Sequence, residues 1–211
     1  MTYSKICGIK NLDSALTVQN HGADYIGFVF HKESKRYINP NEAHIIITKL
    51  KQHPSSLIKC VGLFVNSTAH AIDKIVEQCD LDILQLCGDE SPEFCSGLAI
   101  PVLKVIHVSP RSRVQDLVIQ FELYKNHVNN IILDNGNPSE RGGTGKSFDW
   151  SIASELSAKG YKFFLAGGLN YENIEKAISS IHPYGIDISS GVETDGVKDT
   201  TKITNVLKLI K

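Results

Sequence analysis

The sequence predicts an α/β fold, a closed (β/α)8 barrel (TIM barrel) in which residues 1–211 form a single domain. Three observations indicate this fold. Eight units of a strand and a helix recur at intervals of about 26 residues, the strands are nearly continuous apolar runs of the kind buried on both faces, and no long linker separates the units. An open doubly wound sheet is the alternative. It is disfavoured because the first strand–helix turn, Gly8-Ile9-Lys10-Asn11, lacks the glycine pattern that holds a dinucleotide.

The first half of the chain alternates apolar runs rich in β-branched and aromatic residues with segments whose apolar residues recur at helical spacing. The clearest strand reads DYIGFVF, and Pro40 marks the start of the helix that follows it. In order, we expect a strand at Tyr3–Gly8, a helix at Leu12–His21, a strand at Asp24–Phe30, a helix at Asn41–Lys51, a strand at Leu57–Val65, a helix at Ser67–Cys79, a strand at Asp82–Leu86 and a short helix at Glu90–Gly97.

The second half continues the alternation. Its strands include the apolar runs IIL and KFFLA, and Asp149 is placed to cap the helix that begins there. In order, we expect a strand at Val102–His107, a helix at Val114–His127, a strand at Asn130–Asp134, a helix at about Asp149–Ala158, a strand at Lys162–Ala166, a helix at Glu172–Ile181, a strand at Ile186–Ser189 and a last helix at Thr200–Ile210.

Composition and charge limit the possible functions. With 42% hydrophobic and 21% charged residues the chain is typical of a soluble globular domain, and a formal net charge of −1 predicts no nucleic-acid or membrane partner. The first residues lead into a strand without a signal-type apolar core, so we expect a cytoplasmic protein. The five cysteines are odd in number and lack metal-binding spacing, which indicates reduced thiols and no metal. The expected partner is a small molecule.

The stretch from Ile131 to Trp150 has the pattern of an active-site strand and loop. A buried strand ends on Asp134, and the loop that follows is rich in glycine, Gly143 included, so that peptide N–H groups can approach a ligand closely. An ordinary connection is the plain interpretation, but the loop is long for one. The loop is no nucleotide-binding P-loop, because Glu140 stands where that motif requires glycine.

In a barrel the chemistry sits at the carboxyl ends of the strands, where two further candidates stand. Period-two alternation places Lys5 and Cys7 on one face of the first strand, with Cys7 nearer the mouth. A buried cysteine is more often structural than reactive. Arg36 follows the second strand, where its guanidinium could clamp a carboxylate in bidentate fashion or remain a solvated surface cation.

Small residues follow the seventh and eighth strands. Gly167-Gly168 and Ser190-Gly191 each come directly after an apolar run, and Ser190 is placed to cap a short helical turn. In (β/α)8 barrels the loops after these two strands, with a short extra helix, commonly bind phosphate. Ordinary glycine-rich turns are the alternative, but two such loops at the expected places favour a phosphorylated substrate.

The chain resembles phosphoribosylanthranilate isomerase, an enzyme family of tryptophan biosynthesis, from Lys5 to Asp199. The resemblance lies in a series of motifs that follow the order of the family. They are KICGI (5–9), GADYIGFVF (22–30), SKRY (34–37), VGLFV (61–65), QLCG (85–88), LD (133–134), GGTG with FDW (142–150), LAGGL (165–169) and GIDISSGVE (185–193).

The resemblance implies a barrel without cofactor, a monomer or homodimer. It implies the isomerisation of N-(5′-phosphoribosyl)anthranilate to 1-(2-carboxyphenylamino)-1-deoxy-D-ribulose 5-phosphate, an Amadori rearrangement. By position it implies Cys7 as general base, Asp134 as general acid and Arg36 as ligand of the anthranilate carboxylate. The loops at Gly167-Gly168 and Ser190-Gly191, with Gly143, would hold the phosphorylated substrate.

The two catalytic roles set opposite requirements. Asp134 must have a raised pKa to be protonated near neutrality, whereas a thiolate at Cys7 would be favoured by a nearby Lys5 ammonium. Asp187, at the end of the eighth strand, is placed to bind a ribose hydroxyl.

The sequence leaves two alternatives, and it departs from the family pattern at two places. A non-catalytic phosphosugar-binding barrel would need no acid–base pair, and a sister enzyme of histidine synthesis or indole ring closure would be expected to use a different pair. The family usually reads QLHG where this chain has Cys87, and SPR where it has Ser34-Lys35-Arg36. The role of Cys87 is therefore open.

Overall fold

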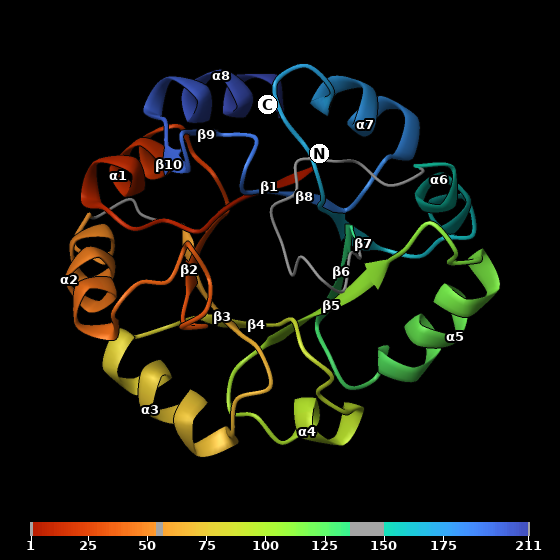
Figure 1. Ribbon diagram of the computed structural model, residues 1–211, viewed down its shortest axis with the longest axis horizontal. Helices are drawn as coiled ribbons and strands as arrows, with labels where there is room; N and C mark the ends of the chain where they lie inside the picture. The colour runs from red at the N-terminus through yellow and green to blue at the C-terminus, as the bar shows by residue number, and fades with distance from the viewer. Residues whose placement is uncertain (1, 54–56, 136–149, 211) are drawn as a thin grey trace.

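The computed structural model describes residues 2–53, 57–135 and 150–210. Eight parallel strands close into a barrel in sequence order, and the helices form a ring around it (Figure 1). The strands are β1 (Tyr3–Cys7), β2 (Tyr25–Val29), β3 (Lys59–Phe64), β4 (Ile83–Leu86), β5 (Val102–Val108), β6 (Asn130–Asn135), β7 (Phe163–Leu165) and β8 (Gly185–Ile188). The predicted (β/α)8 barrel is confirmed.

Several helices begin at residues whose side chains cap them. Asn39 and Ser91 each accept a hydrogen bond from a first-turn backbone N–H, and Pro40 and Pro92 follow them at positions where a missing N–H costs no helical bond. The helices are α1 (Leu12–Asn20), α2 (Pro40–Lys51), α3 (Ala69–Cys79), α4 (Pro92–Ser96), α5 (Val114–Tyr124), α6 (Trp150–Ala158), α7 (Ile174–Ile181) and α8 (Thr200–Ile210).

Two apolar clusters stabilise the barrel. The smaller one fills the interior with inward-pointing side chains from β3, β5, β6 and β7 and the residue after β7: Val61, Leu103, Val105, Ile132, Phe164 and Ala166. The larger one lies between the strands and the helices. Because side chains alternate along a strand, Asp134 points inward like Ile132, and Cys7 points inward like Lys5. The fold thus directs both candidate catalytic groups to one mouth.

The segment after β8 differs from the expectation. The N–H of Val192 donates to the carbonyl of Ser189 at 3.4 Å and the N–H of Glu193 donates to the carbonyl of Ser190 at 3.0 Å, which forms a single turn. An antiparallel hairpin of β9 (Glu193–Thr194) and β10 (Val197–Lys198) then follows. Asp195 and Gly196 join the strands with φ of 51° and 77°, the positive values that a type I′ turn requires. The expected turn at Ser190 is therefore present, and the hairpin, which the Asp-Gly pair favours, is the feature that the sequence analysis did not predict.

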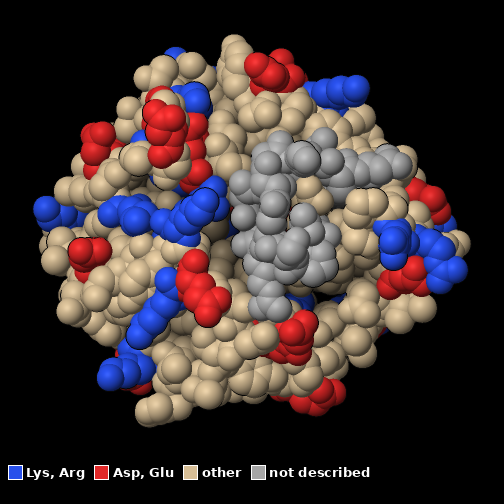
Figure 2. All heavy atoms as spheres, in the orientation of Figure 1, with Lys and Arg blue, Asp and Glu red and all other residues tan. Residues whose placement is uncertain are grey.

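The remaining differences are shifts of element ends by one to three residues, the usual uncertainty of helix and strand ends. None of the described helices is long and apolar enough to cross a membrane. Figure 2 shows acidic and basic side chains interspersed on one face of the molecule, as the near-zero net charge predicts.

Candidate active site

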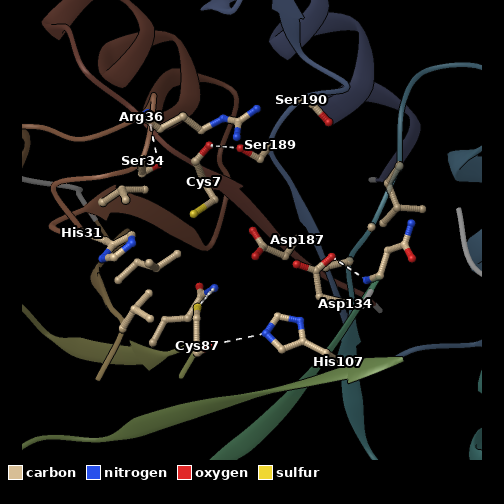
Figure 3. A pocket seen from close by; sticks show the side chains of 18 of the residues that line it. Cys7, His31, Ser34, Arg36, Cys87, His107, Asp134, Asp187, Ser189 and Ser190 are labelled. Atoms are coloured by element: carbon tan, nitrogen blue, oxygen red, sulfur yellow. Dashed lines mark hydrogen bonds between the residues drawn. The ribbon is translucent and has the colours of Figure 1, made fainter. Parts of the chain in front are cut away.

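A pocket opens at the carboxyl ends of the strands and brings together residues from opposite sides of the barrel (Figure 3). Seven of the residues predicted to form the site line it: Cys7, Arg36, Asp134, Gly167, Gly168, Asp187 and Ser190. Gly191 lies in the adjoining loop but is not part of the lining. Gly143 lies outside the described residues. Residues separated by most of the chain therefore share one cavity.

Cys7 lies at the end of β1, buried beside a charged pair. The Nζ of Lys5 donates to Oδ1 of Asp187 at 2.9 Å, and the Lys5 side chain is 0% exposed. Gly27 on β2 leaves the room for this arrangement, since a Cβ there would lie 2.8 Å from the sulfur of Cys7 and 3.2 Å from Nζ of Lys5. The base candidate is thus packed against an ammonium, as alternation along β1 predicts.

The pKa of Cys7 is set by three opposing contributions. Burial raises the pKa of the thiol, and Lys5 lowers it by its charge and hydrogen bond, while the Asp187 carboxylate raises it again. The pKa of Cys7 therefore lies above its ordinary value. Lys5 itself would lose its charge more readily through burial alone, but Asp187 and Cys7 raise its pKa above the ordinary value. The ammonium persists, so the expected stabilisation of the thiolate by Lys5 is confirmed in direction, but burial and Asp187 outweigh it.

This balance predicts the effect of two substitutions on the reactivity of Cys7. In Asp187→Asn the opposing carboxylate is lost, so the pH midpoint for alkylation of Cys7 by iodoacetamide should shift downward. In Lys5→Met the stabilising ammonium is lost, so the midpoint should shift upward. Mass spectrometry identifies the alkylated residue, in a Cys87→Ser background because Cys87 lines the same pocket. Midpoints that do not move in either variant would show that this pair does not control the thiol.

Asp134 lies one residue before the end of β6, on the other side of the pocket from Cys7 (Figure 3). Its Oδ1 accepts a hydrogen bond from the N–H of Asn135 at 2.8 Å. Burial raises the pKa of this carboxyl, His107 lowers it, and Asp187 raises it further, so that it lies above the ordinary value of an aspartate. The direction expected for a general acid is confirmed.

His107 is a pocket residue that the sequence analysis missed. It pairs with Asp134 across the β5–β6 register, and its Nε2–H donates to the carbonyl of Cys87 at 3.2 Å. Period-two alternation from Leu103 and Val105 is the signal that places it inward. Burial raises the pKa of the Cys87 thiol, so Cys87 is neutral, and His107 brings an imidazole to this part of the mouth from β5.

Arg36 lies above the mouth in a fixed pair, not as a solvated cation. Its Nε donates to Oε1 of Glu193 at 2.7 Å and its Nη2 donates to Oε2 at 2.8 Å. Gly8, with a φ of 85°, leaves room for the arginine stem, because a Cβ there would lie 2.6 Å from its Cδ. Glu193 was missed by the sequence analysis, since 157 residues separate it from Arg36.

The two predicted phosphate loops lie against each other. Gly167 and Gly168 adopt φ of 84° and 73°, and an isolated bridge joins Asn170 to Gly191. A Cβ on Gly191 would lie 1.9 Å from the carbonyl oxygen of Leu169, so glycine is required where the loops meet. Backbone N–H groups from loops in this conformation are suited to binding an anion.

A protein-family comparison matches residues 4–209 to the family described as N-(5′-phosphoribosyl)anthranilate (PRA) isomerase. The chain belongs to the phosphoribosylanthranilate isomerase family. It is 41% identical over 208 residues to the N-(5′-phosphoribosyl)anthranilate isomerase of Pelobacter propionicus, an alignment that covers 98% of this chain and 94% of the relative. It is 41% identical over 217 residues to the enzyme of Dehalococcoides mccartyi, covering 100% of this chain and 96% of the relative.

Solved structures of the phosphoribosylanthranilate isomerase family share this fold. The structure of the Thermotoga maritima enzyme superposes with a TM-score of 0.86 at 37% identity, covering 99% of this chain and 98% of the other. A phosphoribosyl anthranilate isomerase in complex with reduced 1-(o-carboxyphenylamino)-1-deoxyribulose 5-phosphate superposes with a TM-score of 0.82 at 36% identity, covering 99% and 97%. The predicted family membership is thus confirmed, and the chain is an enzyme of this family.

Proposed function

We propose that Cys7 and Asp134 are the general base and general acid of the isomerisation that this chain catalyses in tryptophan biosynthesis. The reaction converts N-(5′-phosphoribosyl)anthranilate to 1-(2-carboxyphenylamino)-1-deoxy-D-ribulose 5-phosphate. The observation that carries the proposal is that a thiol on β1 and a carboxyl on β6 line one pocket from opposite sides (Figure 3). The reaction acts at two atoms of the sugar, so an acid and a base must both reach the bound substrate.

The reaction requires an acid at the ring oxygen and a base at C2. Asp134 protonates the ring oxygen, so that the ring opens and the nitrogen lone pair forms a C=N bond to C1. Cys7 then removes the proton from C2, which gives an enolamine. Protonation of C1 and loss of the proton on the C2 hydroxyl convert the enolamine to the ketone. The raised pKa of Asp134 supports the first step, since a carboxyl that retains its proton near neutrality can donate it.

The thiolate needed for the second step is stabilised by Lys5, although burial and Asp187 oppose it. When Asp187 accepts a hydrogen bond from a ribose hydroxyl, as we propose, its negative charge is shared with the substrate and opposes the thiolate less. Binding of the substrate thereby favours the ionised form of the base. The Lys5–Asp187 pair thus couples substrate binding to the charge of Cys7.

The phosphate is assigned to the two glycine loops. Their N–H groups at Gly167, Gly168, Ser190 and Gly191 can donate to phosphate oxygens without the need for a basic side chain. Gly143, outside the described residues, stays a predicted contact. The experiment that tests the function is conversion of N-(5′-phosphoribosyl)anthranilate generated in situ from anthranilate, with the product identified by mass spectrometry. Binding without conversion would favour a non-catalytic phosphosugar-binding barrel.

Arg36 is proposed to bind the anthranilate carboxylate, a group that keeps its charge throughout the reaction. Loss of one partner of a desolvated charged pair costs roughly 2–5 kcal/mol, so Arg36→Ala should raise KM strongly and change kcat little. Arg36→Lys should rescue only part of the loss, because an ammonium lacks the planar fork of a guanidinium. Steady-state kinetics measure both constants. If kcat falls while KM holds, Arg36 takes part in the chemistry and the binding role is wrong.

The remaining assignments are coarser. We propose one catalytic domain over residues 1–211, a cytoplasmic location, and a monomer or homodimer. Five free thiols support the cytoplasm, where thiols are kept reduced. A related phosphoribosylanthranilate isomerase from Thermotoga maritima is described as dimeric. Light scattering after size-exclusion chromatography measures the mass of this chain in solution, and a mass above that of a dimer would exclude both proposed states.

A further inference from the structure

We infer that Glu193 is a positioning residue for substrate binding: together with Lys198 it holds Arg36 so that the Nη1–Nη2 edge of the guanidinium receives the substrate's carboxylate. This inference rests on the proposed role of Arg36. It assigns a task to the β9–β10 hairpin, which the acid–base mechanism does not use.

The hairpin brings two opposite charges together. Glu193 on β9 and Lys198 on β10 are direct cross-strand partners, and the tight turn at Asp195-Gly196 fixes this register. The Nζ of Lys198 donates to Oε1 of Glu193 at 2.6 Å, so that both side chains lie on the same face of the hairpin. The Nζ of Lys202 also donates to the backbone carbonyl of Glu193 at 2.7 Å. The glutamate is therefore held at its side chain and at its backbone.

The Arg36–Glu193–Lys198 triad is shielded from water. The side chains are 18%, 9% and 3% exposed in that order, so the two cations flank a nearly buried carboxylate. Burial alone would raise the pKa of Glu193, but the hydrogen bonds and charges of Arg36 and Lys198 lower it below the ordinary value. The carboxylate is thus charged near neutrality and binds both cations at once. Ion pairs held in this way orient side chains more strongly than exposed pairs do.

The triad is connected to the base. The Nζ of Lys198 also donates to the carbonyl of Ser189 at 2.8 Å, and the hydroxyl of Ser189 donates to the carbonyl of Cys7 at 3.0 Å. A continuous series of hydrogen bonds therefore runs from Arg36 through the end of β8 to the backbone of Cys7. It sets the carboxylate ligand and the base at fixed places relative to each other.

The geometry limits how a substrate can approach Arg36. A guanidinium has five N–H donors in one plane, and Glu193 takes the Nε donor and one Nη2 donor. The edge that can still bind a carboxylate with two parallel hydrogen bonds is the one formed by Nη1 and Nη2. The substrate's carboxylate must therefore approach end-on, in a plane set by Glu193. A freely rotating arginine would impose no such orientation.

The test compares two substrates and two variants at Glu193. For N-(5′-phosphoribosyl)anthranilate, Glu193→Gln should raise KM about 10-fold with kcat within about twofold, because the orienting ion pairs are lost. For the analogue without the carboxylate, N-(5′-phosphoribosyl)aniline made from ribose 5-phosphate and aniline, KM should not change. Glu193→Asp keeps the charge, but its side chain is too short to hold both Arg36 and Lys198. Its KM should therefore also rise for N-(5′-phosphoribosyl)anthranilate and stay unchanged for N-(5′-phosphoribosyl)aniline. If Glu193→Gln does not fold, the Glu193→Asp variant alone tests the positioning role.

A matched control is Glu90→Gln. Glu90 is a buried glutamate whose Oε2 accepts from Nζ of Lys104 at 2.9 Å, but neither residue lines the pocket. Glu90→Gln should lower the thermal stability of the protein. It should not raise the KM for N-(5′-phosphoribosyl)anthranilate relative to the KM for N-(5′-phosphoribosyl)aniline. In the double variant Arg36→Ala with Glu193→Gln, KM should rise no further than in Arg36→Ala alone.

Three outcomes would overturn the inference. A constant KM in both Glu193 variants would mean that Glu193 does not position Arg36, and a lower KM would mean that Glu193 competes with the substrate's carboxylate. KM that rises equally for both substrates would indicate a general structural role. Additive effects in the double variant would show that Glu193 acts independently of Arg36. If Arg36→Ala itself leaves KM unchanged, the proposed role of Arg36 is wrong, and the inference falls with it.

Discussion

Replacing Cys7 with alanine is expected to lower kcat by roughly 10²–10⁴ while leaving the fold intact, because loss of a general base removes a contribution of that size. The substitution removes one sulfur atom from the end of β1 and leaves the Lys5–Asp187 pair in place. Steady-state assays with substrate generated in situ measure the effect. The Kd for reduced 1-(o-carboxyphenylamino)-1-deoxyribulose 5-phosphate, an analogue of the product that cannot react, should stay within a few-fold of the wild-type value.

Cys60 offers a matched control for this variant. It is also a buried cysteine on a barrel strand, but it points toward the helices and does not line the pocket. Cys60→Ala should therefore keep the kcat of the wild type. A Cys7→Ala variant that also turns over at the wild-type rate would reject Cys7 as the base.

Asp134→Asn is expected to reduce kcat by a similar factor, roughly 10²–10⁴, since the amide keeps the shape of the side chain but has no proton to transfer to the ring oxygen. KM should change little, because Asp134 is not proposed to hold a charged group of the substrate. Asp24→Asn is the control. Asp24 lies just before β2, where its carboxylate accepts from the N–H of Ser4 at 2.8 Å, at the opposite end of the barrel from the pocket. Unchanged kinetics in Asp134→Asn would move the acid to another residue.

The fold could be predicted because its signals are local and repeated. Each strand is a short apolar run, each helix has apolar residues at helical spacing, and eight such units in succession allow few architectures. The hairpin was missed because strands of two residues are too short to show alternation. The Asp195-Gly196 pair was the one signal that favoured it.

The site could be predicted only in part. The strand ends placed Cys7, Asp134 and Asp187 at one mouth, because strand parity and a closed barrel determine which way they point. The partner of Arg36 could not be predicted, since loops 157 residues apart meet only in the folded chain.

The sign of the pKa shift of Cys7 was also beyond the sequence. It depends on how burial and the Asp187 carboxylate balance the Lys5 ammonium, and these magnitudes depend on distances. The spacing of Lys5 and Cys7 in the sequence identified the contribution of Lys5 to the pKa of Cys7. It did not identify the contributions of burial and of Asp187, which outweigh that of Lys5.

The acid–base assignment is tested most directly by the deuterium isotope effect on kcat for substrate labelled at ribose C2. In Cys7→Ser, removal of the C2 proton becomes the slow step, so the effect should exceed that of the wild type. In Asp134→Asn, ring opening becomes the slow step, so the effect should fall toward unity. The opposite pattern, a larger effect in Asp134→Asn and none in Cys7→Ser, would contradict the assignment and exchange the two roles.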